Sequence, residues 1–495
     1  NLTTPPSDRW DELIFVKPTA FSLNPDLTDG VVYLDESINH LVQTFGDATT
    51  ANAVVYIALD NEPALWDNTH DKIQTSPPNA ADYVQKVIAA AKAVKSVDPN
   101  IKIIVGEFAG INIYDFGNAP DWATVGADYD WFISYFLDEL KKASDLAGYS
   151  LIDIISFHNY PQHKIDINGD FSSTGIDVKS STSTEDYIRS ARMDFSRSLW
   201  DESYTEPSWL TNAKLNGESN KIWLRIQNSI DTYFPGIKIM IGEYDYGHDT
   251  DVSHGIAVSD LLGAAAQNNI EIINRWDLST STTDTYTSLA YQLFRNYDGE
   301  NSAYGNVAIT STFDNKEHAS VWASIDTDDE DLHLIMMNKN TLSNATIQIT
   351  LNDEDYTHEV EGMYVLDGQS TSIVSNDASA ISIVNGLLTA DLPTLTVYHL
   401  IVKRTKKVSG LKSSLGIGAL KTYPNPFNEQ LTINLDNVPD GGMLKLVSTT
   451  GKLIHQQKIT SLNNFHLNTE KIKKGTYILF IETAQFVHSV LVVKK

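Results

Sequence analysis

The spacing of apolar residues divides residues 31–300 into short apolar runs and longer amphipathic segments. The runs predict β-strands at residues 53–60, 101–107, 151–160, 236–244 and 270–276. Apolar residues at i, i+3, i+4 and i+7 predict helices at residues 31–45, 81–97, 129–148, 220–234, 255–269 and 285–296. Strands that alternate with helices favour an α/β domain with a parallel sheet, which we place at residues 1–300.

After residue 300 the apolar period shortens to two, which predicts antiparallel β-structure. The string "SVWASIDTDDEDLHLIMMNKN" is typical of a hairpin across an acidic turn, and we expect a β-sandwich over residues 301–403. The basic, Ser- and Gly-rich stretch "RTKKVSGLKSSLGIG" predicts a linker at residues 404–420. A second small β domain is expected at residues 421–495.

The formal net charge of −28 is unevenly distributed. From residue 404 onward there are 13 Lys and Arg against 5 Asp and Glu, whereas 59 of the 64 acidic residues lie before it. This change of sign supports a domain boundary. Because so acidic a body would repel nucleic acid and anionic membranes, a neutral or cationic partner is favoured.

Three absent features narrow the possibilities further. The 495 residues contain no Cys, which rules out disulfides, zinc–thiolate sites and thiol catalysis. No window approaches the roughly 18 apolar residues of a membrane helix, so we expect no membrane span. The start, "NLTTPPSDRWDEL", has neither an initiator Met nor a signal-peptide pattern, so we expect a processed chain or one that begins inside a longer protein.

Polar side chains follow the predicted strands at their carboxyl ends, namely Glu62, Glu107, residues 158–160, Glu243 and Trp276. In a (β/α)8 barrel these ends form the active-site face, and no glycine-rich phosphate loop suggests a doubly wound sheet instead. Two carboxyl groups that meet on this face could cleave a glycosidic bond. A strand-end glutamate is equally a structural cap, so the residue types alone leave its role open.

Longer strings around these residues are more specific. They are "FSLNPDLTDGVVYLDESINHLV", "LDNEPALWDNTH", "VGEFAGINIYDFGNAPDW", "FHNYP", "YFPGIKIMIGEYDYG" and "FRNYDG", in this order. Over roughly residues 20–400 the chain resembles glycoside hydrolase family 44, and its "NEP" resembles the acid/base motif of retaining barrel glycosidases. The resemblance implies an endo-acting enzyme that cleaves β-1,4-glucans or xyloglucan.

The same resemblance implies roles for single residues. Glu62 would be the general acid/base and Glu243 the nucleophile of a double displacement. Asn61 would bind the 2-hydroxyl of the sugar in the cleavage subsite. The remaining substrate-binding residues would be His158, Tyr160, Trp276 and Trp66.

Of these four, His158 and Tyr160 would line the subsite, and Tyr160 would also orient Glu243. Trp276 would form a platform under a sugar ring and Trp66 another subsite wall. Packing roles stay open for His158, Tyr160 and Trp66, because strand ends often carry aromatic side chains that only fill space.

Two positions depart from the family pattern. Glu107 stands where the family usually has a neutral residue, so we interpret it as non-catalytic, although its charge would perturb the neighbouring carboxylates. Asn159 stands where an aromatic residue is more usual, which puts the shape of one sugar subsite in doubt.

The resemblance implies no required cofactor and permits a structural calcium ion. The acidic strings "DTDDED" (326–331) and "DINGD" (166–170) lack the full spacing of a calcium loop, so we interpret both as solvated turns and assign no metal ligand.

Such barrels carry the acid/base after the fourth strand and the nucleophile after the seventh. Only 52 residues precede Ala53, too few for three βα units, so we expect an N-terminally truncated barrel that retains strands four to eight. The arginine that these barrels place near the nucleophile, on strand two, would be absent. An open sheet leaves two unpaired edges, which predicts poor stability and little or no activity for this chain.

The basic tail carries a second resemblance. "YPNPFNEQLTINL", "LVSTTGKLI" and "NTEKIKKGTYILFIE", followed by "VLVVKK", resemble the C-terminal sorting domain of type IX secretion in Bacteroidetes-type bacteria. This implies contact with that secretion machinery and a secreted or cell-surface protein. An ordinary carbohydrate-binding β module is the alternative.

Two further functions remain open at this stage. Another retaining barrel glycosidase, such as a mannanase or a xylanase, would use the same two glutamates. A non-catalytic surface protein that only binds glycans would use the same aromatic side chains.

Overall fold

The computed structural model describes residues 12–26, 28, 30–276, 285–327, 330–407, 421–434, 442–459, 465–482 and 487–495. Two compact units are formed, one from residues up to 351 together with 358–404, and the other from residues 352–357 and 405–495. Most of the predicted linker, residues 408–420, lies outside the described residues. The domain boundaries that we place at residues 300, 403 and 420 stay predictions.

The predicted parallel sheet is confirmed. Its five strands pair in the order β3-β4-β5-β8-β9, and all four pairs are parallel. The strands are β3 (Tyr56–Ala58), β4 (Lys102–Ala109), β5 (Ile154–Asn159), β8 (Lys238–Tyr244) and β9 (Ile270–Ile273). The sheet is the expected partial barrel, because β3 and β9 end it at two edges.

The two faces of β4 explain why its sequence is apolar almost without interruption. Ile103 and Val105 belong to the core under the helices, whereas Ile104 packs with Ile154 and Met240 on the opposite face. A strand buried on both faces needs apolar residues at consecutive positions.

The helices that cover the sheet match the predicted ones closely. They are α1 (Leu34–Phe45), α3 (Ala80–Val97), α5 (Phe132–Ala147), α9 (Ile222–Tyr233), α10 (Val252–Gln267) and α11 (Tyr286–Arg295). None of the helices in the described part of the chain combines the length and apolar character needed to cross a bilayer.

The predicted helix at residues 31–45 begins three residues late. Val31–Tyr33 form strand β2, which pairs in parallel with β1 (Glu12–Ile14). β-Branched and aromatic residues favour such an extended segment over a first helical turn.

Several short elements have no counterpart in the apolar pattern. They are η1 (Pro63–Leu65), α2 (Trp66–Thr69), η2 (Gly110–Asn112), α4 (Trp122–Val125), β6 (Lys164–Ile165), β7 (Ile176–Asp177), α6 (Asp186–Met193), α7 (Arg197–Trp200) and α8 (Trp209–Lys214). Segments of two to eight residues are too short for a period to be recognised.

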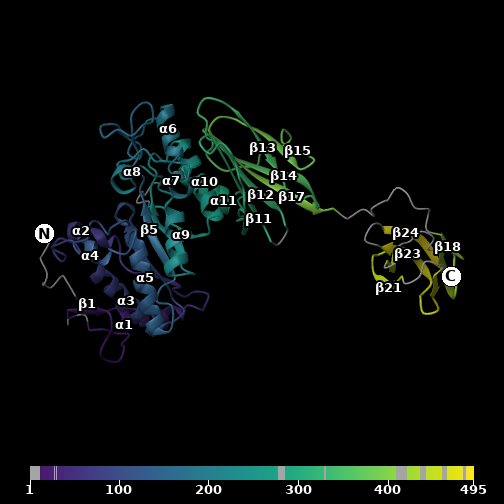
Figure 1. The fold of residues 1–495 in the computed structure, drawn as a ribbon, viewed down its shortest axis with the longest axis horizontal. Helices are drawn as coiled ribbons and strands as arrows, with labels where there is room; N and C mark the ends of the chain where they lie inside the picture. Colours follow the sequence, from purple (N-terminus) through teal and green to yellow (C-terminus); the bar gives the residue numbers. More distant parts are fainter. Residues whose placement is uncertain are drawn as a thin grey trace. The chain divides into compact units, whose positions relative to one another are not determined.

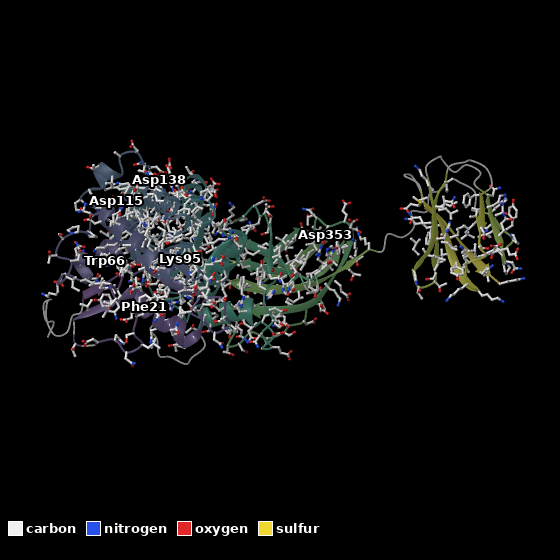
Figure 2. All side chains as sticks on the ribbon, turned by 90° about the horizontal axis from the view of Figure 1, so that it is seen from below. Phe21, Trp66, Lys95, Asp115, Asp138 and Asp353 are labelled. Atoms are coloured by element: carbon white, nitrogen blue, oxygen red, sulfur yellow. The ribbon has the colours of Figure 1, made fainter. Side chains whose placement is uncertain are left out.

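Aromatic side chains fill the layer between the sheet and its helices. The ring of Tyr83 on α3 stacks on Phe116 and Phe136, and Phe108 of β4 contacts Tyr83 edge-on. Figure 2 shows how densely side chains fill this unit around the labelled Lys95 of α3. This aromatic layer therefore supports the carboxyl end of β4 from the side of the helices.

The predicted sandwich is also confirmed. One sheet has the order β10-β11-β12-β17-β14 and the other β13-β16-β15. The strands are β10 (Val307–Ile309), β11 (Ala319–Ile325), β12 (Leu332–Asn338), β13 (Ala345–Thr350), β14 (Tyr356–Leu366), β15 (Ser382–Val384), β16 (Leu387–Leu392) and β17 (Thr396–Lys406). The hairpin predicted across the acidic turn is the antiparallel pair β11–β12.

Helix α10 joins the parallel sheet to the sandwich, and Figure 1 shows α10 and α11 between them. Asp260 of α10 accepts a hydrogen bond from the indole of Trp322 (2.9 Å) and forms an ion pair with Lys339 (3.3 Å). Both members of the ion pair are fully buried. A side chain at Gly263 would collide with Trp322, since its Cβ would lie 2.1 Å from the ring.

The second unit contains two small antiparallel sheets, β18-β19-β22 and β21-β20-β23-β24, around one apolar core. The strands are β18 (Lys421–Tyr423), β19 (Gln430–Asn434), β20 (Met443–Ser448), β21 (Leu453–Lys458), β22 (Phe465–Asn468), β23 (Gly475–Glu482) and β24 (Val487–Lys494). This arrangement confirms the small β-sandwich predicted there.

We predict that Lys339→Met lowers the free energy of unfolding by about 3 kcal/mol, because it leaves the carboxylate of Asp260 buried without its counter-charge. Urea unfolding followed by Trp fluorescence measures the change. The matched control is Lys403→Met, which breaks the exposed pair with Glu361 and should change little. Equal effects of the two substitutions would contradict the structural role of the buried pair.

Candidate active site

Three glutamates from three strand ends meet around one histidine of β5. Glu62 follows β3, Glu107 lies in β4 and Glu243 lies in β8. One carboxylate oxygen of Glu62, one of Glu243 and a ring nitrogen of His158 lie within 4.8 Å of one another. The side chains of Glu62 and Glu243 are 23% and 18% exposed, whereas that of His158 is 1% exposed. The first two are therefore open to a ligand, and His158 lies beneath them.

The backbone at the end of β3 turns sharply to present Glu62. Asp60 and Glu62 both have left-handed backbone angles, with φ of 66° and 42°. Pro63 then begins the 3-10 helix η1, as expected from its fixed φ at a first helical position. The N–H of Glu62 donates to the carbonyl of Glu107 (3.0 Å), which fixes this turn against the next strand.

The carboxylate of Glu243 is oriented by Tyr160. The Tyr160 hydroxyl donates to Glu243 Oε2 at 2.7 Å. Burial, together with this hydrogen bond to a carboxylate, raises the pKa of Tyr160 well above its ordinary value, so the hydroxyl remains a donor at any physiological pH.

The imidazole of His158 contacts all three carboxylates. Its Nδ1 lies 2.8 Å from Glu62 Oε1 and 3.3 Å from Glu243 Oε2, and its Nε2 lies 3.3 Å from Glu107 Oε2. Burial opposes the charged form, but the three carboxylates outweigh it and raise the pKa of His158 to about 9. His158 is therefore an imidazolium at neutral pH.

Glu107 is buried, with 7% of its surface exposed, and accepts a hydrogen bond from the hydroxyl of Ser156 at 2.6 Å. From the sequence we expect Glu107 on the active-site face and interpret it as non-catalytic. β4 and β8 share the string Gly-Glu-aromatic near their carboxyl ends, as Gly106-Glu107-Phe108 and Gly242-Glu243-Tyr244, and this similarity is a signal that both glutamates enter the site.

The remaining predicted residues lie around this centre. Asn61 is exposed beside Glu62, and Trp276 is 45% exposed just after β9. The backbone N–H of Trp276 donates to the backbone carbonyl of Tyr244 in β8 (2.9 Å), which ties the segment after β9 to the strand of Glu243. Asn159 donates from its amide to the hydroxyl of Tyr246 at 3.1 Å.

Trp66 is held mostly by contacts with the protein. Its indole N–H donates to the carbonyl of Asn61 at 3.1 Å, and its ring meets Tyr83 edge-on at 6.0 Å. Figure 2 labels it on the ribbon. These contacts support the turn that carries Glu62, and a sugar contact by Trp66 stays a prediction.

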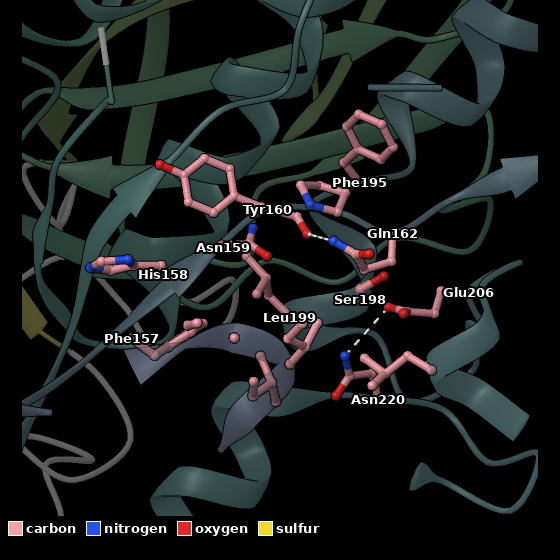
Figure 3. Close-up of a pocket in the computed structure, with 16 residues that line it drawn as sticks. Phe157, His158, Asn159, Tyr160, Gln162, Phe195, Ser198, Leu199, Glu206 and Asn220 are labelled. Carbon is pink, nitrogen blue, oxygen red and sulfur yellow. Dashed lines mark hydrogen bonds between the residues drawn. The ribbon is translucent and has the colours of Figure 1, made fainter. Parts of the chain in front are cut away.

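A cavity of about 160 Å³ adjoins the site along the end of β5. Figure 3 shows Glu206 and Asn220 on the opposite side of this cavity from His158. The carboxylate of Glu206 accepts hydrogen bonds from Ser208 (2.6 Å) and Asn220 (3.3 Å). It is thus a satisfied buried carboxylate that does not contact His158.

The chain is similar to known proteins over most of its length. Residues 6–163 match the model of glycoside hydrolase family 44. A family 44 xyloglucanase from Paenibacillus polymyxa superposes with a TM-score of 0.74 and is 33% identical, over 81% of this chain and 76% of that chain. The chain belongs to glycoside hydrolase family 44.

Two curated relatives of this family 44 chain are similar in sequence as well. Endoglucanase A of Paenibacillus lautus is 38% identical over 413 residues, which are 81% of this chain and 55% of the relative. A β-mannanase/endoglucanase A of Caldicellulosiruptor saccharolyticus is 35% identical over 360 residues, 70% of this chain and 26% of the relative. The chain thus spans about half the length of the first relative and a quarter of the second.

Residues 421–495 of the family 44 chain match the secretion system C-terminal sorting domain. The predicted sorting domain is therefore confirmed, and it indicates export through the type IX system.

We predict that Gly242→Ala disrupts the site, because a Cβ at this position would lie 1.7 Å from Glu107 Oε2. The free energy of unfolding should fall by about 1–3 kcal/mol, as for overpacked cores. Gly362→Ala in β14 is the matched control, since its Cβ would meet only ordinary contacts at 3.6 Å or more. Urea titrations of both variants check this, and equal stability of the two would contradict the crowding at Gly242.

Proposed function

We propose that this chain is the catalytic part of a retaining endo-glycosidase that cleaves the backbone of β-1,4-glucans, including xyloglucan, by double displacement. The observation that carries the proposal is the approach of Glu62 and Glu243 to within 4.8 Å across His158. Retaining enzymes hold their two carboxyl groups about 5–5.5 Å apart, whereas inverting enzymes leave about 6.5–9.5 Å for a water molecule.

In the first step, an oxygen of Glu243 attacks the anomeric carbon while Glu62 transfers its proton to the departing glycosidic oxygen. A glycosyl ester on Glu243 and an ionised Glu62 result. In the second step, Glu62 removes a proton from water, the water oxygen bonds to the anomeric carbon, and the ester bond to Glu243 breaks. Both residues return to their starting protonation states, and no cofactor is required.

The surrounding residues then take the roles implied by the family. Asn61, beside Glu62, binds the 2-hydroxyl of the sugar, and Tyr160 orients Glu243 through its 2.7 Å hydrogen bond. The exposed ring of Trp276 forms a platform under a sugar ring, as aromatic side chains with one free face do. A structural calcium ion stays a prediction without assigned ligands.

The relatives support the proposed substrate class. The Paenibacillus polymyxa enzyme is a xyloglucanase that has also been solved with xyloglucan, and the Paenibacillus lautus relative is an endoglucanase. A neutral polysaccharide also suits an acidic protein better than an anionic partner. We infer that the sorting domain brings this activity to the cell surface or the medium.

We predict that Glu243→Gln in the full-length enzyme reduces the release of reducing ends from xyloglucan and carboxymethylcellulose to background, because the amide cannot form the glycosyl ester. Glu62→Gln should lose about 10²–10⁴-fold, and less with aryl glycosides whose leaving group needs no proton. Glu139→Gln on α5, which is paired with Lys142 far from the site, is the control and should keep the wild-type rate. Retention of most activity by Glu243→Gln would refute the assignment.

A substrate panel decides between the remaining candidates. Xylan and mannan are included because the Caldicellulosiruptor saccharolyticus relative is a β-mannanase/endoglucanase. Faster cleavage of mannan or xylan than of either glucan would identify another retaining activity at the same two glutamates. Binding of glucan without release of reducing ends, in a version restored to full length, would identify a glycan-binding protein.

A further inference from the structure

Glu107 takes no part in the proposed reaction, yet the end of β4 is irregular at the point where Glu107 enters the site. The pairing of β4 with β5 shifts between Val105 and Phe108. Gly106 has φ of 101° and Glu107 has φ of 40°, in the left-handed region that a side chain such as glutamate rarely adopts. Such strained residues are concentrated at functional sites.

The next two strands of the sheet, β5 and β8, provide the space and a hydrogen bond for this side chain. On β8, Gly242 leaves open the space that Glu107 Oε2 occupies, since a Cβ there would lie only 1.7 Å away. On β5, the hydroxyl of Ser156 donates to the same oxygen at 2.6 Å. The carboxylate of Glu107 is therefore fixed in orientation.

Glu107 contacts both Glu62 and His158. Its carbonyl accepts from the backbone N–H of Glu62, and its carboxylate lies 3.3 Å from Nε2 of His158. Nε2 is buried and has no hydrogen bond among the described residues. The charged group beside it is the carboxylate of Glu107. The other charged groups around His158 are Glu62 and Glu243 on the Nδ1 side, with the hydroxyl of Tyr160 bonded to Glu243.

We propose that Glu107 is a positioning residue that acts through His158. Its carboxylate keeps the ring doubly protonated, so that the Nδ1–H can donate to whichever of Glu62 and Glu243 is ionised. This inference rests on the proposed double displacement.

The two steps of the reaction explain why such a fixed cation is useful. Negative charge leaves Glu243 when its oxygen bonds to the anomeric carbon, and appears on Glu62 when Glu62 gives up its proton. The Nδ1 of His158 lies 2.8 Å from one carboxylate and 3.3 Å from the other, so a small rotation transfers its hydrogen bond. A neutral His158 could instead carry its single proton on Nε2, and this donor would then be lost.

The first test is the pH profile of Glu107→Gln with xyloglucan as substrate. Without the Glu107 charge, His158 should lose its proton at lower pH. We expect the alkaline limb of kcat/KM to fall by about one pH unit or more, because a negative charge beside His158 and Glu62 is lost. An unmoved alkaline limb would overturn the proposal.

Glu206→Gln is the matched control, since it neutralises a buried carboxylate of the adjoining cavity that does not contact His158. Its alkaline limb should stay at the wild-type position, and an equal shift in both variants would also overturn the proposal. In a His158→Gln background, Glu107→Gln should cause no further shift, because the effect is transmitted by the ring.

The second test does not depend on activity and remains valid if Glu107→Gln fails to fold. Side-chain ¹⁵N spectra of the full chain with labelled histidine, assigned with His158→Gln, follow the protonation of His158 directly. Both ring nitrogens should stay protonated to about pH 9, and titration of the ring below pH 7 would overturn the proposal. Failure of the proposed function would appear separately, as activity that survives Glu243→Gln.

Discussion

The imidazolium of His158 is the charge on which the geometry of the site depends. Carboxylates of Glu62, Glu107 and Glu243 approach it from three different strand ends. Like charges this close in a partly buried site repel one another, and a cation between them offsets this repulsion. The 1% exposure of His158 removes it from water, so the carboxylates, and not solvent, determine its charge.

The site is built almost entirely from strands that are neighbours in the sheet. β3, β4, β5 and β8 are consecutive in the sheet order, and each contributes one charged group to the cluster. Because the strands are parallel, their carboxyl ends lie at the same end of the sheet. The breaks in register at β4–β5 and β5–β8 turn side chains inward at this end. The geometry of the candidate site is therefore a local property of four strands. Their backbone hydrogen bonds to one another fix it, as the bond from Glu62 to the carbonyl of Glu107 illustrates.

The sequence predicted the order of these elements well, because long runs such as residues 81–97 and 101–107 carry an unambiguous apolar period. It also indicated Glu62 and Glu243, since both follow such runs within specific motifs. It placed Glu107 at the same strand ends but could not show that its carboxylate meets His158, because the direction of that side chain depends on two residues with left-handed backbone angles and on a glycine 135 positions later in the chain. Apolar periodicity contains no information about a β-bulge, and a contact between distant residues cannot be inferred from one sequence.

The unfavourable features at Glu107 themselves argue for function. A non-glycine residue with left-handed backbone angles costs of order 1–3 kcal/mol, and burial of a carboxylate adds to this cost. A neutral side chain in a regular strand would avoid both costs, as would a larger residue at Gly242 that closed the space. Stability alone therefore does not account for the arrangement of Gly106, Glu107 and Gly242. The role that we propose for Glu107, which keeps a cation beside the two carboxylates of the proposed double displacement, does account for it.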